Sequence, residues 1–238
     1  MTEKVNGITV FTVNYKDSDK ILTLFTLEKG KITANAKGVR KANAKCKPVS
    51  EPFCFAEIML AEKSGRYTVT EVNSFDSFYP IRLDLRKYYA GMTALEFTDA
   101  FMQDGMEDPD HFVLLAEFLK DLSYGDGDAK DKLAEFLYSA VNQSGYSMAL
   151  SVCGRCGKEI KDRVFLSVKD GYCVCDECRK TGEGEFSYDT YKYLKALCDG
   201  LALSHDEDCA NNALKFFGYY VSKVSGVNLK CLTTLIEL

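Results

Sequence analysis

The sequence predicts an α+β protein in several parts: a small N-terminal β-barrel, then an α-helical domain with an inserted four-cysteine ribbon. Three observations support this fold class. Short runs that alternate apolar and polar residues fill the first 80 residues, and from Pro80 the apolar residues recur at helical spacing. Five of the ten cysteines lie between Cys153 and Cys178. We expect domain boundaries that give 1–79, 80–150 together with 181–238, and 151–180.

Composition limits the class of protein. The chain has 238 residues, of which 46% are hydrophobic and 27% charged, and this excludes a disordered or collagen-like chain. No apolar run reaches the roughly 20 residues needed to cross a bilayer. The N-terminal residues carry charges of both signs and lead directly into a strand-like pattern, so we expect no signal peptide. The expected location is the cytoplasm.

Residues 1–80 contain five expected strands. The run 8–13 is rich in β-branched residues, and 20–37 predicts a hairpin that turns at Gly30. A second hairpin joins 53–60 to 67–72 through Ser64 and Gly65. Five short strands are enough for a small closed barrel without an open edge. An oligonucleotide-binding (OB) barrel and an SH3-like barrel fit this pattern equally.

Charge is distributed unevenly along the chain. The net charge is −5, yet residues 1–80 hold 12 Lys and Arg against 9 Asp and Glu, while the remaining residues hold 18 against 26. Residues 29–47 contain seven cations and no acid. Such a block is typical of an exposed surface that meets phosphate, and also of a solvated face without a partner. The seven cations are Lys29, Lys31, Lys37, Arg40, Lys41, Lys45 and Lys47.

After Pro80 the apolar pattern becomes helical. Residues 81–95 predict one long amphipathic helix, and Asp108-Pro109 predicts the N-cap and first residue of another. Gly125-Asp126-Gly127 breaks that helix, and further apolar stripes cover 133–141, 194–201 and 214–224. Stripes of this kind are typical of a helical core.

The cysteines of the ribbon have the spacing of metal ligands. Cys153, Cys156, Cys175 and Cys178 form a C-x2-C-x18-C-x2-C pattern, which predicts a structural zinc site with four thiolates. Cys173 is the spare cysteine, because pairing it with Cys175 gives a C-x-C with poorer geometry for a knuckle. Structural disulfides and a redox dithiol are the alternatives.

The sequence gives little support for catalysis. It contains no phosphate-binding P-loop, no dinucleotide fingerprint and no nucleophile elbow. The only two histidines, His111 and His205, lie outside known metal-binding motifs. We expect each of them to be solvated or to cap a helix. The protein is therefore expected not to be an enzyme.

The N-terminal residues carry a family resemblance. The segment 15–26, then Gly30-Lys31 and Lys37-Gly-Val-Arg-Lys41, resembles the RecO family of bacterial recombination and repair mediators, as do Asp17 and Asp19. The resemblance covers essentially the whole chain. It implies an OB-fold barrel, a helical domain and a zinc ribbon. It also implies an ATP-independent protein of the cytoplasm and nucleoid that binds single- and double-stranded DNA and anneals complementary strands. The implied partners are RecR and the single-strand-binding protein, on whose DNA complex the recombinase is loaded.

The expected DNA contacts follow from the charge pattern. The seven cations of residues 29–47 would contact phosphates, and Phe11, Tyr15 and Phe25 are candidates for stacking on bases, although barrel aromatics are more often core. A second function class stays open at this point: a non-catalytic scaffold or adaptor that acts through its acidic helical domain.

Overall fold

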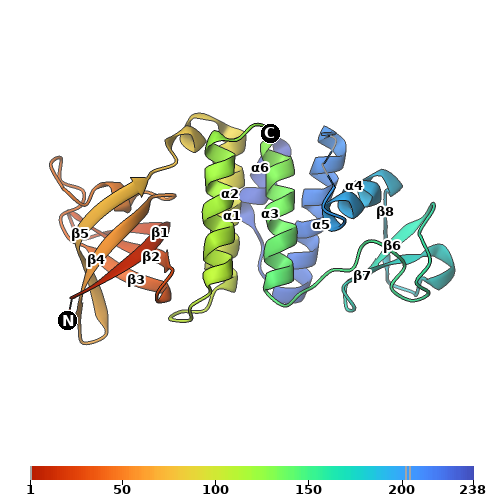
Figure 1. The fold of residues 1–238 in the computed structure, drawn as a ribbon, viewed down its shortest axis with the longest axis horizontal. Coiled ribbons are helices and arrows are strands. Elements are labelled where there is room, and N and C mark those ends of the chain that lie inside the picture. The colour runs from red at the N-terminus through yellow and green to blue at the C-terminus, as the bar shows by residue number, and fades with distance from the viewer. Residues whose placement is uncertain (1, 202, 204) are drawn as a thin grey trace. The chain divides into compact units, whose positions relative to one another are not determined.

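The computed structural model describes residues 2–201, 203 and 205–238. The chain forms two compact units, unit 1 up to Asp126 and unit 2 from Gly127. Unit 1 holds a five-stranded barrel and two α-helices, and unit 2 holds four α-helices and a three-stranded sheet (Figure 1). This boundary falls inside 80–150, which the sequence assigns to a single helical domain. The three-part division therefore stays a prediction.

The barrel closes in the strand order β1-β2-β3-β5-β4. Every neighbouring pair is antiparallel except β3 and β5, which pair in parallel with Ala34 opposite Tyr67. A closed five-stranded barrel with this connectivity is OB-like, which decides between the two barrels that the sequence allows. The strands are β1 (Thr2–Tyr15), β2 (Asp19–Thr26), β3 (Gly30–Ala36), β4 (Phe55–Lys63) and β5 (Arg66–Asp76).

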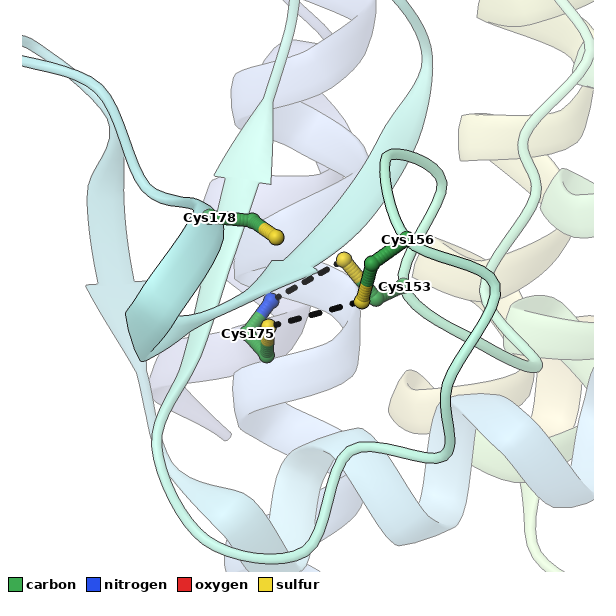
Figure 2. Close-up of side chains that lie close together, drawn as sticks. All are labelled: Cys153, Cys156, Cys175 and Cys178. Atoms are coloured by element: carbon green, nitrogen blue, oxygen red, sulfur yellow. Dashed lines mark hydrogen bonds between the residues drawn. The ribbon is translucent and has the colours of Figure 1, made fainter.

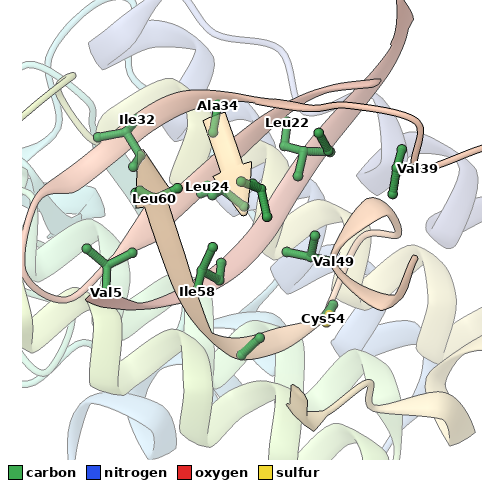
Figure 3. Close-up of a cluster of buried hydrophobic side chains, with 13 residues drawn as sticks. Val5, Leu22, Leu24, Ile32, Ala34, Val39, Val49, Cys54, Ile58 and Leu60 are labelled. Carbon is green, nitrogen blue, oxygen red and sulfur yellow. The ribbon is translucent and has the colours of Figure 1, made fainter. Parts of the chain in front are cut away.

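The barrel interior is filled by aliphatic side chains, most of them from alternate positions of the strands (Figure 3). Three members of this core lie outside the strands, and one of them is Cys54, directly before β4. Val39 follows β3, and Val49 belongs to the short 3-10 helix η1 (Pro48–Ser50); both are buried in the same cluster. Residues 37–47, which we call the basic loop, therefore have a buried anchor near each end.

Two helices complete unit 1. The 3-10 helix η2 (Tyr79–Leu83) contains Pro80 and Ile81, so the long helix expected over 81–95 begins later, as α1 (Leu85–Phe101). Helix α2 (Pro109–Tyr124) begins as predicted, because the Asp108 carboxylate accepts a hydrogen bond from the backbone of His111 at 2.9 Å. It ends at Gly125, as the glycine pair predicted.

Unit 2 contains the remaining helices. The three predicted apolar stripes are confirmed by the burial of Leu133, Leu194 and Leu214. Leu201 was expected on the second stripe, but it follows the end of its helix and is exposed. The helices are α3 (Ala129–Gln143), α4 (Tyr188–Cys198), α5 (Glu207–Ser225) and α6 (Lys230–Glu237). None of the helices formed by the described residues is long and apolar enough to cross a membrane.

The cysteine-rich segment, expected to be a ribbon, contains a β-hairpin. Strands β6 (Val164–Ser167) and β7 (Tyr172–Cys175) pair in antiparallel fashion around Gly171, and η3 (Asp176–Cys178) follows as a single 3-10 turn. A third strand, β8 (Gly184–Phe186), pairs with the other edge of β6. The sequence does not predict β8, because three residues are too few to establish an alternating pattern.

Candidate metal centre and nucleic-acid interface

The structure brings the four predicted ligand cysteines together. The sulfurs of Cys153, Cys156, Cys175 and Cys178 all lie within 4.8 Å of one another, and the four side chains converge from two turns (Figure 2). The Cys156 and Cys175 sulfurs are 3.9 Å apart. Four thiolates at about 2.3 Å from one zinc ion lie about 3.8 Å apart along the edges of their tetrahedron. The cluster therefore has the dimensions of a four-thiolate metal site.

The first cysteine pair lies in a tight knuckle that depends on two glycines. The Gly157 N–H donates to the Cys153 carbonyl at 2.8 Å, and Gly157 has a φ of +70°, a conformation that favours glycine. A Cβ on Gly154 would lie 2.3 Å from the ring of Tyr172. Residues with side chains at these two positions would open the turn that aims both sulfurs at the centre.

Electrostatics at the cluster favour a bound cation. Burial raises the pKa of the Cys153 thiol, but hydrogen bonds from the backbone of Cys175, Cys156 and Arg155 outweigh it and lower the pKa to about 6. The pKa of Cys178 rises to about 12, because its sulfur contacts those of Cys175 and Cys156. One thiolate forms readily, whereas each further negative sulfur is disfavoured by its neighbours. A divalent cation removes that repulsion.

Cys173 lies outside the cluster. It is buried, its backbone pairs with Leu166 and with Ala149, and its sulfur is not among the four that converge. All ten cysteines are free thiols, so the arrangement matches the metal-site prediction and contains none of the disulfides considered as an alternative.

Arg155 connects the two turns of the metal site. Its guanidinium donates to the carbonyl oxygen of Cys178 at 2.6 Å and forms a two-pronged ion pair with Glu183. The hydrogen bonds that Arg155 donates to Glu183 lower the pKa of that carboxyl to about 2. A residue of the first knuckle thus holds the second knuckle in place, as outer residues around metal ligands commonly do.

Five of the seven predicted DNA-contacting cations lie together on the basic loop. Their side chains are exposed, and the loop runs through a series of turns whose backbone hydrogen bonds join residues three apart. No acid occurs within the loop. The five are Lys37, Arg40, Lys41, Lys45 and Lys47.

The other two cations are engaged inside unit 1. Lys29 forms an ion pair with Glu3 at 3.0 Å. Lys31 donates to the carbonyl oxygen of Asp99 at 2.5 Å and forms ion pairs with the carboxylates of Asp99 and Asp104 at 3.5 and 3.4 Å. Lys31 therefore ties β3 to α1 and to the turn after it. The sequence pattern groups these two lysines with the loop because it does not reveal their acidic partners.

The three candidate stacking residues separate by burial. Phe11 and Tyr15 are 51% and 41% exposed on β1, whereas Phe25 is fully buried. Phe25 packs against the rings of His111 and Phe112 on α2, so its suggested role in stacking is wrong. Tyr15 is paired across the β1–β2 turn with Asp19, and the Asp19 carboxylate in turn contacts Gly38 of the basic loop.

Asp19 joins the β1–β2 turn to the basic loop. Its carboxylate accepts a hydrogen bond from the Gly38 N–H at 2.7 Å. The Arg40 N–H donates to the Ser18 carbonyl at 3.0 Å, and the Arg40 guanidinium donates to the Asp17 carbonyl at 3.2 Å. The turn that follows Tyr15 is therefore hydrogen-bonded to the basic loop.

His111 is a core residue, which corrects the expectation of a solvated or capping side chain. Its backbone takes part in the α2 cap, but its ring is fully buried and its Nε2 lies 3.0 Å from the Thr98 hydroxyl. Because the Thr98 hydroxyl donates to the Ala94 carbonyl at 2.9 Å, His111 is the donor to Thr98. Burial lowers the pKa of His111 to about 4. The sequence contains a signal for this burial: His111 lies four residues before Leu115, which places it on the apolar face of α2.

His205 behaves as a surface residue. Its Nδ1 contacts the Asp131 carboxylate at 2.8 Å, and this contact raises its pKa. Asp128 also lies near, but its carboxylate caps α3 by accepting from Lys130 N–H, and Asp131 also accepts from the Tyr193 hydroxyl. These carboxylates serve the local structure of unit 2.

A groove of about 950 Å³ lies in unit 2 between the ribbon sheet and α5. The aromatic side chains of Phe216 and Tyr219 line it, together with three lysines, Lys169, Lys180 and Lys215. Within the described part of the chain, none of these lysines forms an ion pair. No pattern in the sequence predicts the groove, because its walls come from segments that are far apart along the chain.

Two family models together match most of this chain. A family model described as Recombination protein O N terminal matches residues 1–78, and one described as Recombination protein O C terminal matches 82–232. The DNA repair protein RecO of Clostridium novyi is 32% identical over 197 residues, which is 82% of this chain and 76% of that protein. The RecO of Pelobacter propionicus is 34% identical over 184 residues, covering 76% of this chain and 73% of the relative.

Proposed function

Since this chain belongs to the RecO family of DNA repair proteins, we propose that it binds single- and double-stranded DNA and anneals complementary strands without ATP. We propose further that, with RecR, it helps to load the recombinase onto DNA coated by the single-strand-binding protein. Its place of action is the cytoplasm, at the nucleoid. The family resemblance noted in the sequence is confirmed; the mediator activity is the proposal.

One observation carries the proposal. A closed OB-like barrel carries five exposed cations on a loop without acids, and it also exposes the rings of Phe11 and Tyr15 on β1. Proteins that bind single strands combine a cationic track for phosphates with aromatic platforms for bases. Both parts are present in the barrel of unit 1.

The proposed annealing needs no catalytic group. Two complementary strands repel each other through their phosphates, and cations that neutralise part of this charge lower the barrier to their encounter. Aromatic side chains that stack on bases hold them unpaired and available. We therefore propose that the protein acts as a binding platform and that it is not an enzyme.

We propose zinc as the resident metal of the four-cysteine cluster. Cys153, Cys156, Cys175 and Cys178 would fill a tetrahedral site and leave no open position, so the ion would be structural. Its chemistry would be to neutralise the thiolates and to fix the ribbon. The four cysteines belong to unit 2, so zinc is expected to stabilise that unit.

We propose the two protein partners for different reasons. RecR is proposed from family membership alone. For the single-strand-binding protein we propose the groove of unit 2. Its aromatic residues and the lysines Lys180 and Lys215 suit a peptide that carries both acidic and apolar residues. The acids that also line the groove, Asp170, Glu183 and Glu185, are each paired with an arginine. Replacing Lys180 and Lys215 with Glu should weaken capture of the single-strand-binding protein and leave binding of bare DNA unchanged.

A strand-annealing assay tests the function directly. Two complementary fluorescent oligonucleotides are mixed with the protein, without nucleotide, over a range of salt concentrations, with the single-strand-binding protein present or absent. We expect acceleration that fades as salt rises and that persists on protein-coated strands. No acceleration at low salt would reject the mediator function and favour an adaptor that acts through the helices of unit 2.

A further inference from the structure

Two acidic residues lie beside the proposed phosphate surface, where electrostatics alone disfavours them. Asp17 is exposed, and its carboxylate forms no hydrogen bond or ion pair with any of the described residues. Asp19 is half-buried, and its carboxylate accepts hydrogen bonds from Gly38 N–H at 2.7 Å and from the Ser18 hydroxyl at 3.4 Å. A carboxylate near a phosphate lowers affinity by repulsion. The hydrogen bond with Gly38 offers a reason for Asp19 to be there.

The backbone that Asp19 holds is the first turn of the basic loop. Gly38 has a φ of +64°, and its carbonyl accepts from the Lys41 N–H at 3.1 Å. Arg40 is fixed in the same turn, since its N–H donates to the Ser18 carbonyl and its guanidinium to the Asp17 carbonyl. The turn thereby sets where the side chains of Arg40 and Lys41 begin.

We propose that Asp19 is a positioning residue for DNA binding: its carboxylate holds the Gly38 turn, and the turn presents Arg40 and Lys41 to the phosphate backbone. The inference rests on the proposed DNA-binding function of the loop. A loop already held in its binding conformation loses less conformational entropy when DNA arrives. The negative charge of Asp19 lowers the affinity for DNA, but its hydrogen bond to the Gly38 turn raises that affinity by more.

Two substitutions of equal charge separate position from charge. Asp19→Asn removes the charge but keeps an oxygen that can accept from Gly38, whereas Asp19→Ala removes both. Binding of a fluorescent oligothymidylate by the full chain is measured by anisotropy over a salt series. We expect Asp19→Ala to bind about fivefold more weakly than Asp19→Asn. We also expect its salt slope to be shallower by about 0.7 for each phosphate that the protein no longer neutralises.

Asp17 provides the matched control. Arg40 uses its carbonyl oxygen and not its carboxylate, so Asp17→Asn and Asp17→Ala should bind alike. Amide hydrogen exchange gives an independent reading of the turn: Gly38 should exchange faster in Asp19→Ala than in Asp19→Asn.

A third variant tests the inference even if Asp19→Ala does not fold. Asp19→Glu keeps the charge and displaces the carboxylate by one methylene, so weaker binding than wild type supports positioning. Equal affinities of Asp19→Asn and Asp19→Ala, both tighter than wild type, would overturn the inference while leaving the DNA-binding function intact. Failure of the wild-type protein to bind at low salt would instead reject the proposed function on which it rests.

Discussion

The Nε2 atom of His111 lies 3.0 Å from the Thr98 hydroxyl, and the imidazole is enclosed between α1, α2 and the ring of Phe25. Burial lowers the pKa of His111 to about 4, against about 6.5 in an unfolded chain. Between these two values the unfolded state binds a proton that the folded state does not. The free energy of unfolding is therefore expected to fall as the pH decreases through this window.

The His111 effect can be measured by urea unfolding of the full chain at several pH values. Above pH 6.5 the neutral His111 leaves the free energy of unfolding at its full value. Between pH 6.5 and about pH 4 this free energy is expected to fall by at most about 3 kcal/mol. His111→Gln should be less stable at neutral pH but should lose this part of the pH dependence. His205→Gln is the control, because His205 is exposed and its pKa shifts the other way. An unchanged pH profile in His111→Gln would contradict the prediction.

The metal site predicts one tightly bound ion per chain. Cys156→Ser should abolish stoichiometric zinc in native mass spectrometry and should loosen the ribbon, because three thiolates leave the site open to water. Cys173→Ala is the matched control: Cys173 lies outside the four-sulfur cluster, so this variant should keep its zinc. Equal loss of zinc in both variants would show that the ligand set is wrong.

Arg155 should increase the affinity of the four-cysteine site for zinc. Its guanidinium bridges the first knuckle to the carbonyl of Cys178 while pairing with Glu183. Arg155→Lys keeps the charge but not the planar fork, so we expect zinc affinity to fall by about 10- to 100-fold, the usual range for an outer residue of a metal site. Competition with a colorimetric chelator measures this. Lys158→Ala, at another cation of the same segment, should leave the affinity unaffected.

Charge reversal on the basic loop should weaken DNA binding. Arg40→Glu with Lys41→Glu removes two cations of the proposed phosphate-binding loop, and we expect the single-strand salt slope to become shallower by about 1.4. The thermal transition should be unchanged because both side chains are exposed. Lys120→Glu with Lys223→Glu makes the same change in net charge on exposed helical positions. Equal loss of affinity in both pairs would mean that only net charge matters.

The exposed barrel aromatics should contribute through stacking. Tyr15→Ala is expected to weaken oligothymidylate binding by about 1–3 kcal/mol if one base stacks on the ring. This loss should change little with salt, unlike the loss from cations of the basic loop. Tyr79→Ala removes a tyrosine ring of η2 that is more exposed than that of Tyr15, and this variant should bind as wild type does. A salt-dependent loss in Tyr15→Ala would indicate that Tyr15 acts by placing Lys16, which lies over its ring.

The sequence alone determined the features that depend on neighbouring residues. Alternation of apolar residues placed the two hairpins, Asp108 and Pro109 placed the start of α2, and two closely spaced cysteine pairs identified the four-sulfur cluster. Each of these signals spans a few residues, and the local rules of hydrogen bonding and spacing apply within that length.

Only the tertiary structure decided how distant residues share these elements. It closed the barrel by pairing β3 with β5, buried His111 and Phe25 against each other, and joined Lys31 to Asp99. It also brought Asp19 to Gly38 and so connected two turns of the proposed DNA surface. Burial and ion pairing depend on which side chains are in contact. These contacts follow from the packing of elements that are far apart in the chain.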